Sequence, residues 1–370
     1  MTIKIKKKIS IISLSAAITL ILFFITDIFF SNFISKNDYF AACYQRDEDF
    51  YFLKSNCEAY EKYASNNYKI ITNNFGMRVS EKNTNNKNKK NYFFVGDSQV
   101  YGIGLEYKDT FVGILEKNYE EYNFYNLALP SYSPTVYYYK INKFIELLKP
   151  EKIFILIDLT DIYDETYRWK ISNTNGTPSL IDKKKKNNEI SLDKTFSSKI
   201  DKFKDKNFKG TKIISFHLRE FFRALKRKIF VSKKEKINLQ KKVQKTEVGK
   251  ITYQKLPIDR DINLMKLNLE NKIIEISNLK EKHNFDLYLI TLPYPETLEY
   301  GQNEFDWENF IFDLCKKSSC KKHISLFPVF SKAKTKEDNW LNKYFINNDF
   351  HPNKNGHYLI YNEIKKIFKN

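Results

Sequence analysis

The organisation of this chain follows from one stretch, Asn91-Tyr-Phe-Phe-Val-Gly-Asp-Ser-Gln-Val-Tyr-Gly-Ile-Gly104. Its apolar, aromatic start predicts a buried strand that ends at the turn Gly96-Asp97-Ser98. Gly96 permits a backbone bend that a larger residue would resist. Ser98 would then lie at the carboxyl end of a strand, where open α/β sheets place their ligands. Such a serine is a candidate nucleophile if a base reaches it, although Gly-Asp-Ser alone is also ordinary turn chemistry.

Strands and helices alternate along the chain around this stretch. We expect strands at residues 92–95, 122–127, 152–157, 286–292 and 324–327. Helices are expected at about residues 110–119, from Pro134 to about 148, at 262–283, at 304–317 and after His357 to the end. Strands separated by helices predict βαβ units, and therefore an α/β domain with a mainly parallel sheet.

A base for Ser98 is found near the end of the chain, which has five histidines. His351 stands in a polar loop before the terminal helix, and Asp349 lies two residues earlier. The histidine would take the proton of the serine hydroxyl, and the aspartate would hold the ring. His351 alone could equally cap a helix or fill the core. Considered with Ser98 and Asp349, it favours catalysis.

These residues resemble the SGNH/GDSL hydrolase superfamily. The match is closest to its anchored or periplasmic members, which are related to enzymes that add or remove acetyl groups on bacterial polysaccharides. The motifs that carry it are Asn73-Asn-Phe-Gly-Met-Arg78, Gly96-Asp97-Ser98, Tyr101-Gly-Ile-Gly104, Leu292-Pro-Tyr-Pro295 and Asp349-Phe-His-Pro-Asn-Lys-Asn-Gly-His357. The resemblance implies a flavodoxin-like three-layer α/β/α sandwich and a serine that attacks an ester carbonyl.

The resemblance also implies an oxyanion hole made by the serine amide, a glycine amide and an asparagine side chain. This chain has Ser131 at the position of the glycine and Thr160 at that of the asparagine. A serine amide still donates a hydrogen bond, and a threonine hydroxyl offers one donor. The usual aspartate position, three residues before the histidine, holds Asn348. Asp349, at two residues, has the spacing of the alginate-acetylation branch.

The N-terminus predicts a membrane anchor. Residues 1–8 are rich in lysine, and residues 9–30 form an apolar run with one charge, Asp27. A helix of that length spans a bilayer, and the lysines place residues 1–8 in the cytoplasm. We expect a single-pass protein whose C-terminal part is extracytoplasmic, in the periplasm or on the cell surface. A cleaved signal peptide is the alternative.

The rest of the chain divides into three predicted parts. Residues 31–90 form a juxtamembrane lead-in, residues 91–165 and 258–370 form the SGNH-like catalytic domain, and residues 166–257 form a basic insertion. The chain has a net charge of +19, and residues 183–250 contain 23 Lys and Arg against 7 Asp and Glu. Apolar residues at helical spacing between 214 and 229 predict a basic amphipathic helix, which would pack on the domain or lie on a membrane.

Four cysteines suit an oxidising compartment. Pairing of Cys43 with Cys57 and of Cys315 with Cys320 is the simplest of the three possible connectivities, with four free thiols as the alternative. No clustered His and Cys residues suggest a metal, and no cofactor is expected.

The sequence therefore predicts a membrane-anchored serine esterase or O-acyltransferase. Its substrate would be an acylated, most simply acetylated, extracytoplasmic glycan. A transferase would need a membrane partner to export the acyl group, and the outward topology argues against nucleic acid as a partner. The alternative is a catalytically inactive SGNH-fold subunit that binds polysaccharide in an envelope glycan assembly.

Overall fold

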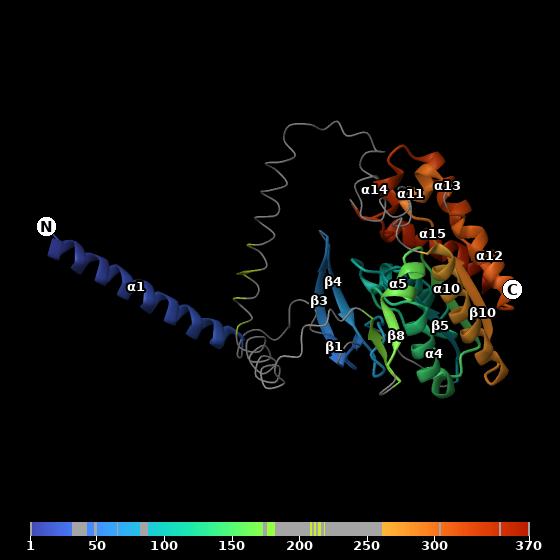
Figure 1. Cartoon of the computed structure of the whole chain (residues 1–370), viewed down its shortest axis with the longest axis horizontal. Coiled ribbons are helices and arrows are strands. Elements are labelled where there is room, and N and C mark those ends of the chain that lie inside the picture. Colours follow the sequence, from blue (N-terminus) through green and yellow to red (C-terminus); the bar gives the residue numbers. More distant parts are fainter. Residues whose placement is uncertain are drawn as a thin grey trace. The chain divides into compact units, whose positions relative to one another are not determined.

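A computed structural model gives the fold of the chain (Figure 1). It describes residues 2–31, 43–47, 50–64, 66–81, 88–172, 176–181, 261–302, 305–347 and 349–368, together with 208, 211, 214, 215 and 218. The chain forms two compact units. One contains Met1–Ala41 and Lys184–Lys236, and the other contains Ala42–Lys183 and Ile237–Asn370. The second unit carries every predicted site residue.

The second unit is built on a five-stranded sheet. Its strands are β5 (Lys90–Val95), β6 (Tyr122–Asn126), β7 (Lys152–Ile157), β10 (Asp286–Thr291) and β11 (Lys322–Ser325). They lie in the order β11-β10-β7-β5-β6, and every neighbouring pair is parallel. Numbered along the chain, this is the flavodoxin-like order 2-1-3-4-5. The predicted α/β fold with a parallel sheet is confirmed.

Helices cover both faces of this sheet (Figure 1). α3 (Phe111–Asn118) packs against the terminal helix α15 (Lys354–Ile364). α10 (Ile262–Asn278) packs against α4 (Pro134–Leu148), α5 (Asp161–Tyr167) and α12 (Trp307–Lys317). Right-handed crossovers place these two groups on opposite faces, because the chain moves one way from β5 to β6 and the other way from β6 to β11.

The strands are buried because helices lie over both sheet faces. The four residues Tyr92, Phe93, Phe94 and Val95 are all at most 3% exposed. The ring of Phe154 in β7 stacks between Phe94 in β5 and Tyr288 in β10, with centroids 4.8 and 4.7 Å apart. These aromatic contacts join three adjacent strands across one face of the sheet.

Two hairpins precede the sheet and belong to the same compact unit. β1 (Tyr44–Asp47) pairs with β2 (Phe50–Leu53), and β3 (Glu58–Tyr63) pairs with β4 (Asn66–Ile71). Within the predicted lead-in at residues 31–90, the described part therefore contains these four strands. Short apolar runs within a polar, Asn-rich region gave little sign of these strands.

The predicted cysteine pairing is confirmed. Cys43 is bonded to Cys57, which links the first hairpin to the second, and Cys315 is bonded to Cys320 at the end of α12. Both bridges join residues that are close in sequence, as the local connectivity required.

Shorter elements complete the described part of this unit. They are α2 (Ser98–Tyr101), η2 (Tyr107–Asp109), β8 (Trp169–Ile171), β9 (Pro178–Leu180), η3 (Leu279–Glu281), α11 (Pro295–Tyr300), α13 (Phe327–Lys336), α14 (Trp340–Tyr344) and η4 (Lys365–Ile367). The β8–β9 hairpin falls within the predicted insertion at 166–257, yet it belongs to the compact unit of the sheet, and Trp169 is 1% exposed. Most of the remaining insertion, including nearly all of the predicted helix at 214–229, lies outside the described residues.

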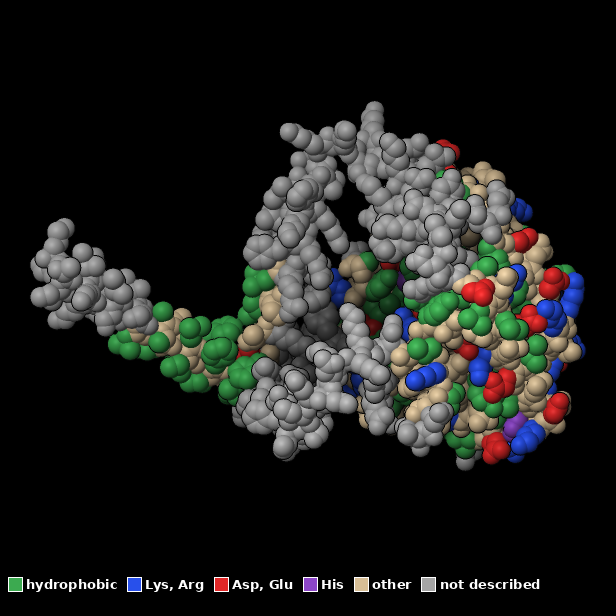
Figure 2. Space-filling model, viewed as in Figure 1, with side chains coloured by type: hydrophobic (Ala, Val, Ile, Leu, Met, Phe, Trp, Pro, Cys, Tyr) green, Lys and Arg blue, Asp and Glu red, His purple; other side chains and the backbone are tan. Residues whose placement is uncertain are grey.

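The first unit contains α1 (Thr2–Phe29), and side chains are described from Leu14 onward. Figure 2 shows hydrophobic side chains along this part of the helix. Within the described residues, no helix is both long enough and apolar enough to cross a membrane. This finding gives no support to the predicted span at residues 9–30. On the visible face of the second unit, basic and acidic side chains are interspersed (Figure 2).

Candidate active site

The nucleophile candidate lies in a tightly packed turn at the end of β5. Asp97 caps the short helix α2, and its Oδ1 accepts the amide of Gln99 at 2.9 Å. A Cβ atom on Gly96 would lie 2.4 Å from Val100 Cγ2 and 3.1 Å from the Leu156 carbonyl oxygen. Glycine is therefore needed at 96 because strand, turn and helix approach closely. Gly96 is not among the glycines with a positive φ, so close packing, and not a left-handed backbone, is what favours glycine there.

The structure brings Ser98, His351 and Asp349 together. Ser98 Oγ lies 2.8 Å from His351 Nε2, and His351 Nδ1 lies 2.5 Å from Asp349 Oδ1. These residues are 253 positions apart in the first pair and two apart in the second. Ser98 is 7% exposed and His351 is 5% exposed. The candidate nucleophile, its candidate base and the carboxylate beside that base thus form a continuous hydrogen-bonded chain.

The hydrogen bonds of Asp349 favour the imidazole tautomer of His351 that carries its proton on Nδ1. Asp349 Oδ1 also accepts the His351 backbone amide at 2.9 Å. Burial raises the pKa of Asp349, but hydrogen bonds from His351 and Tyr63 outweigh burial, and the net pKa is lowered. An ionised Asp349 accepts the Nδ1 proton of a neutral imidazole, so Nε2 is left as an acceptor facing Ser98. His351 is thereby arranged as a general base.

A second acceptor competes for the Ser98 proton. Ser98 Oγ donates to Asp97 Oδ2 at 3.0 Å in the structure, and a hydroxyl has only one proton to give. Burial, together with the neighbouring Asp158 carboxyl, raises the pKa of Asp97 well above its usual range. A higher pKa favours the neutral carboxyl, which is a poorer acceptor than a carboxylate. The environment of Asp97 therefore weakens its competition with His351 for the Ser98 proton.

Two main-chain amides lie at the edge of the sheet where the sequence predicts an oxyanion hole. Ser98 follows β5 and Ser131 follows the adjacent strand β6, so both lie at the carboxyl edge of the sheet. Ser131 has φ +63°, a left-handed conformation that favours glycine. Its carbonyl oxygen accepts the indole N–H of Trp169 at 2.8 Å. Among the described residues, neither the Ser98 amide nor the Ser131 amide has a hydrogen-bond acceptor.

Thr160 has a different arrangement from the predicted one. It follows β7, at the same edge of the sheet, but its hydroxyl donates to Asp158 Oδ1 at 2.6 Å. Its amide donates to the same oxygen at 2.7 Å, and Tyr294 donates to Asp158 Oδ2 at 2.6 Å. The single hydroxyl proton of Thr160 is thus used in holding the end of β7, and it is not directed at a substrate oxygen.

Sequence reasoning missed Tyr63, which reaches the triad from β3. Its hydroxyl donates to Asp349 Oδ2 at 2.8 Å and lies 3.1 Å from His351 Nδ1. Its ring packs edge-on against the imidazole, with centroids 5.3 Å apart. No local sequence pattern distinguishes Tyr63 from the other tyrosines of the predicted lead-in at residues 31–90, so nothing in the sequence assigned it to the site.

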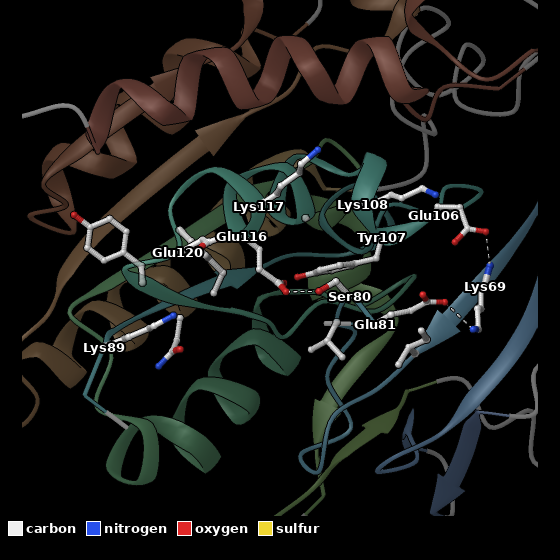
Figure 3. A pocket seen from close by; sticks show the side chains of 16 residues that line it. Lys69, Ser80, Glu81, Lys89, Glu106, Tyr107, Lys108, Glu116, Lys117 and Glu120 are labelled. Atoms are coloured by element: carbon white, nitrogen blue, oxygen red, sulfur yellow. Dashed lines mark hydrogen bonds and ion pairs between the residues drawn. The ribbon is translucent and has the colours of Figure 1, made fainter. Parts of the chain in front are cut away.

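A separate pocket of about 850 Å³ lies beside the edge strand β6 (Figure 3). Ser80 and Glu116 face each other in it and are joined by a hydrogen bond, and Lys69 pairs with Glu81 at its rim. No predicted site residue lines this pocket. Among the described residues, no group of three or more His, Cys, Asp and Glu side chains is arranged to hold a metal ion.

Comparisons with known proteins give matches among solved structures only, since no family model and no curated protein matches the chain. A member of the lipolytic protein G-D-S-L family from Veillonella parvula is similar, with a TM-score of 0.42 and 11% identity over 76% of this chain and 99% of that one. Axe2, an acetyl-xylooligosaccharide esterase from Geobacillus, is similar in a variant form, with a TM-score of 0.38 and 10% identity over 76% and 95%. TesA is similar with a TM-score of 0.40 and 10% identity over 76% and 98%.

Proposed function

We propose that the chain is an SGNH-type serine esterase or O-acyltransferase that acts through an acyl-enzyme. The observation that carries this proposal is the hydrogen-bonded chain from Ser98 Oγ through His351 to Asp349. A serine hydroxyl is a weak nucleophile unless a base receives its proton, and the geometry supplies that base at 2.8 Å.

The first half of the reaction forms the acyl-enzyme. Ser98 Oγ attacks the ester carbonyl while its proton moves to His351 Nε2, and Asp349 stabilises the resulting imidazolium. The oxyanion accepts hydrogen bonds from the amides of Ser98 and Ser131, each of which contributes roughly 3 kcal/mol in comparable sites. The bond to the leaving alcohol then breaks, and His351 returns the proton to that oxygen.

The second half of the reaction decides between the two activities. A hydroxyl group attacks the acyl-Ser98 carbonyl, His351 takes its proton, and Ser98 leaves with that proton returned to it. Water as the attacking group gives an esterase, and a sugar hydroxyl gives an O-acyltransferase. The substrate proposed is an acylated glycan, on the basis of the sequence motifs shared with enzymes of polysaccharide acetylation.

The cellular setting is part of the same proposal. The lysines at the start of the chain, the apolar run at 9–30 and the four paired cysteines support an anchored protein facing an oxidising space. As a transferase the protein would receive acyl groups from a membrane partner. Retention of the full chain in alkali-washed membranes tests the anchor, and recovery in the soluble fraction would count against it.

The experiment for activity labels the full-length protein with a fluorophosphonate probe. Wild type should form an adduct, while Ser98→Ala and His351→Ala should lose it by at least about a hundredfold, since triad members act as a unit. Ser179→Ala, in the β8–β9 hairpin, is the matched control and should label as wild type does. Turnover of an aryl acetate, with and without oligosaccharide acceptors, then separates hydrolysis from transfer.

A second candidate is a catalytically inactive subunit that binds polysaccharide. It is favoured by the Thr160 hydroxyl, which donates to Asp158. The expected oxyanion hole then lacks the third donor that a side chain at position 160 would supply. Folded wild-type protein without any adduct would support this candidate, and an adduct that depends on Ser98 would exclude it.

A further inference from the structure

We propose that Tyr63 is a positioning residue of the active site, acting on His351 through Asp349. This inference rests on the proposed function and adds to it a residue from the hairpin that precedes the sheet. The consequence is that the site is incomplete without residues of β3, although all three triad members lie elsewhere.

The contacts of Asp349 carry the inference. Its Oδ1 is used by the ring and the backbone amide of His351, and its Oδ2 receives the Tyr63 hydroxyl at 2.8 Å. With both oxygens held by donors, the carboxylate cannot rotate about its terminal bond without losing a hydrogen bond. The plane of the carboxylate, and with it the direction of His351 Nδ1–H, is therefore fixed from the side of Tyr63.

The chemistry of the tyrosine suits this role. Burial, followed by the Asp349 charge, raises the pKa of Tyr63 far above its usual value. The phenol therefore stays protonated and donates at every pH at which Asp349 is ionised. A hydrogen bond to a charged group contributes more free energy than one between neutral groups. We therefore expect loss of the Tyr63 hydroxyl to disturb the orientation of His351.

Neighbouring contacts hold Tyr63 in place. Asn66, on the paired strand β4, donates from Nδ2 to the Gly104 carbonyl oxygen at 3.1 Å. A Cβ on Gly104, which has φ +79°, would lie 3.3 Å from Tyr63 Cδ1 and 3.0 Å from Ile346 Cδ1. Glycine at 104 thus lets the turn after α2 pack closely against the tyrosine ring. The hairpin and the nucleophile turn are fixed to each other at this point.

A double-mutant cycle on the full-length protein tests the proposal. Tyr63→Phe keeps the ring and removes only the hydroxyl, and we expect kcat for an aryl acetate to fall about tenfold or more, with KM within about twofold. In the Asp349→Asn background the same change should cost less than about twofold, because the tyrosine acts through that carboxylate. Tyr60→Phe, on the same strand, is the matched control and should leave kcat unchanged.

The outcomes separate this inference from the proposed function. If wild type is inactive and unlabelled by fluorophosphonate, the proposed function fails and the cycle has no signal. If wild type is active and Tyr63→Phe keeps full kcat, the positioning role is overturned. An equal loss in both backgrounds, or a loss confined to KM, also overturns it, because the tyrosine would then act independently of Asp349 or on substrate binding.

Discussion

Ser131 stands where the sequence pattern predicts glycine, and it retains the main-chain amide that we propose for the oxyanion hole. The expected glycine would adopt φ > 0 without cost, whereas Ser131 adopts φ +63° with a side chain. The Trp169 indole N–H donates to the Ser131 carbonyl oxygen, and the Ser131 amide N–H remains available to donate to a substrate oxygen. The main chain, and not the hydroxyl, is therefore the group expected to serve the oxyanion.

Substitutions at Ser131 test that assignment. Ser131→Ala and Ser131→Gly both retain the amide, so fluorophosphonate labelling should stay within about threefold of wild type, a difference below ~1 kcal/mol. The free energy of unfolding of Ser131→Gly should equal that of wild type or exceed it by up to ~1 kcal/mol. Glycine removes the cost of a side chain in the left-handed conformation, but it also increases the conformational entropy of the unfolded chain, which offsets part of the gain. A hundredfold loss of labelling in Ser131→Ala alone would instead make the hydroxyl the donor.

Arg78 links two elements that are separate in sequence. It follows β4, and its side chain is fully buried. Nη1 donates to the carbonyl oxygens of Tyr101 and Gly102 at 2.7 and 2.9 Å, and Nη2 donates to that of Leu105. The guanidinium also lies 4.9 Å from the centre of the Tyr101 ring. The end of α2 and its following turn are thus held by one planar group with several donors.

Arg78→Lys should destabilise the protein by about 2–4 kcal/mol in urea unfolding. The ammonium keeps the charge but cannot satisfy three carbonyl groups in the fixed geometry of the guanidinium, and buried acceptors left without donors are costly. Arg168→Lys is the control, since Arg168 forms a partly exposed pair with Asp164 at 3.6 Å, and it should cost less than ~1 kcal/mol. Equal effects of the two changes would contradict the role given to Arg78.

Stability of the whole molecule should depend on pH through His357. This histidine is 1% exposed on α15, and its Nδ1 accepts the Phe111 amide of α3 at 3.2 Å. Burial first, and then the charge of Arg78, lower its pKa to about 3. Between pH 6.5 and about 3 the unfolded chain binds a proton that the folded protein excludes. The contribution of neutral His357 is therefore complete above pH 6.5 and is lost as the pH falls.

His357→Asn removes this titration, and its amide oxygen can still accept from Phe111. Relative to wild type, the variant should gain roughly 2–3 kcal/mol in free energy of unfolding between pH 7 and pH 4.5, at about 1.4 kcal/mol per pH unit. The variant has to be compared with wild type at each pH, because Asp97 and Asp161 also affect the pH dependence. Both are buried carboxyl groups with raised pKa values, and they increase the stability as the pH falls. Parallel stability curves for the two proteins would show that His357 does not carry the effect.

Local sequence patterns predicted much of the sheet domain because their physical causes are local. Apolar runs and helical spacing identified the five strands of the sheet and most of its long helices, with boundaries close to those observed. Ser98, Asp349 and His351 were predicted from their residue types and positions in the chain, and the structure places them within hydrogen-bonding distance of one another. The cysteine pairs were found because each closes a short loop. For the strands, helices and cysteine pairs the information lies within a few residues, whereas the catalytic prediction required Ser98 and His351 to be considered together.

Tertiary packing decided the features that depend on distant groups. Tyr63 reaches Asp349 across 286 positions, and no spacing in β3 marks it as part of a site. The Thr160 hydroxyl is held by Asp158, which also receives Tyr294 from beyond β10. The direction in which each of these hydroxyl groups donates its proton is determined by where its acceptor lies in the folded chain. Residue types and motifs in the sequence thus identify candidate groups for the proposed chemistry, whereas their orientation is a property of the tertiary structure, because a hydrogen bond depends on the position of both partners.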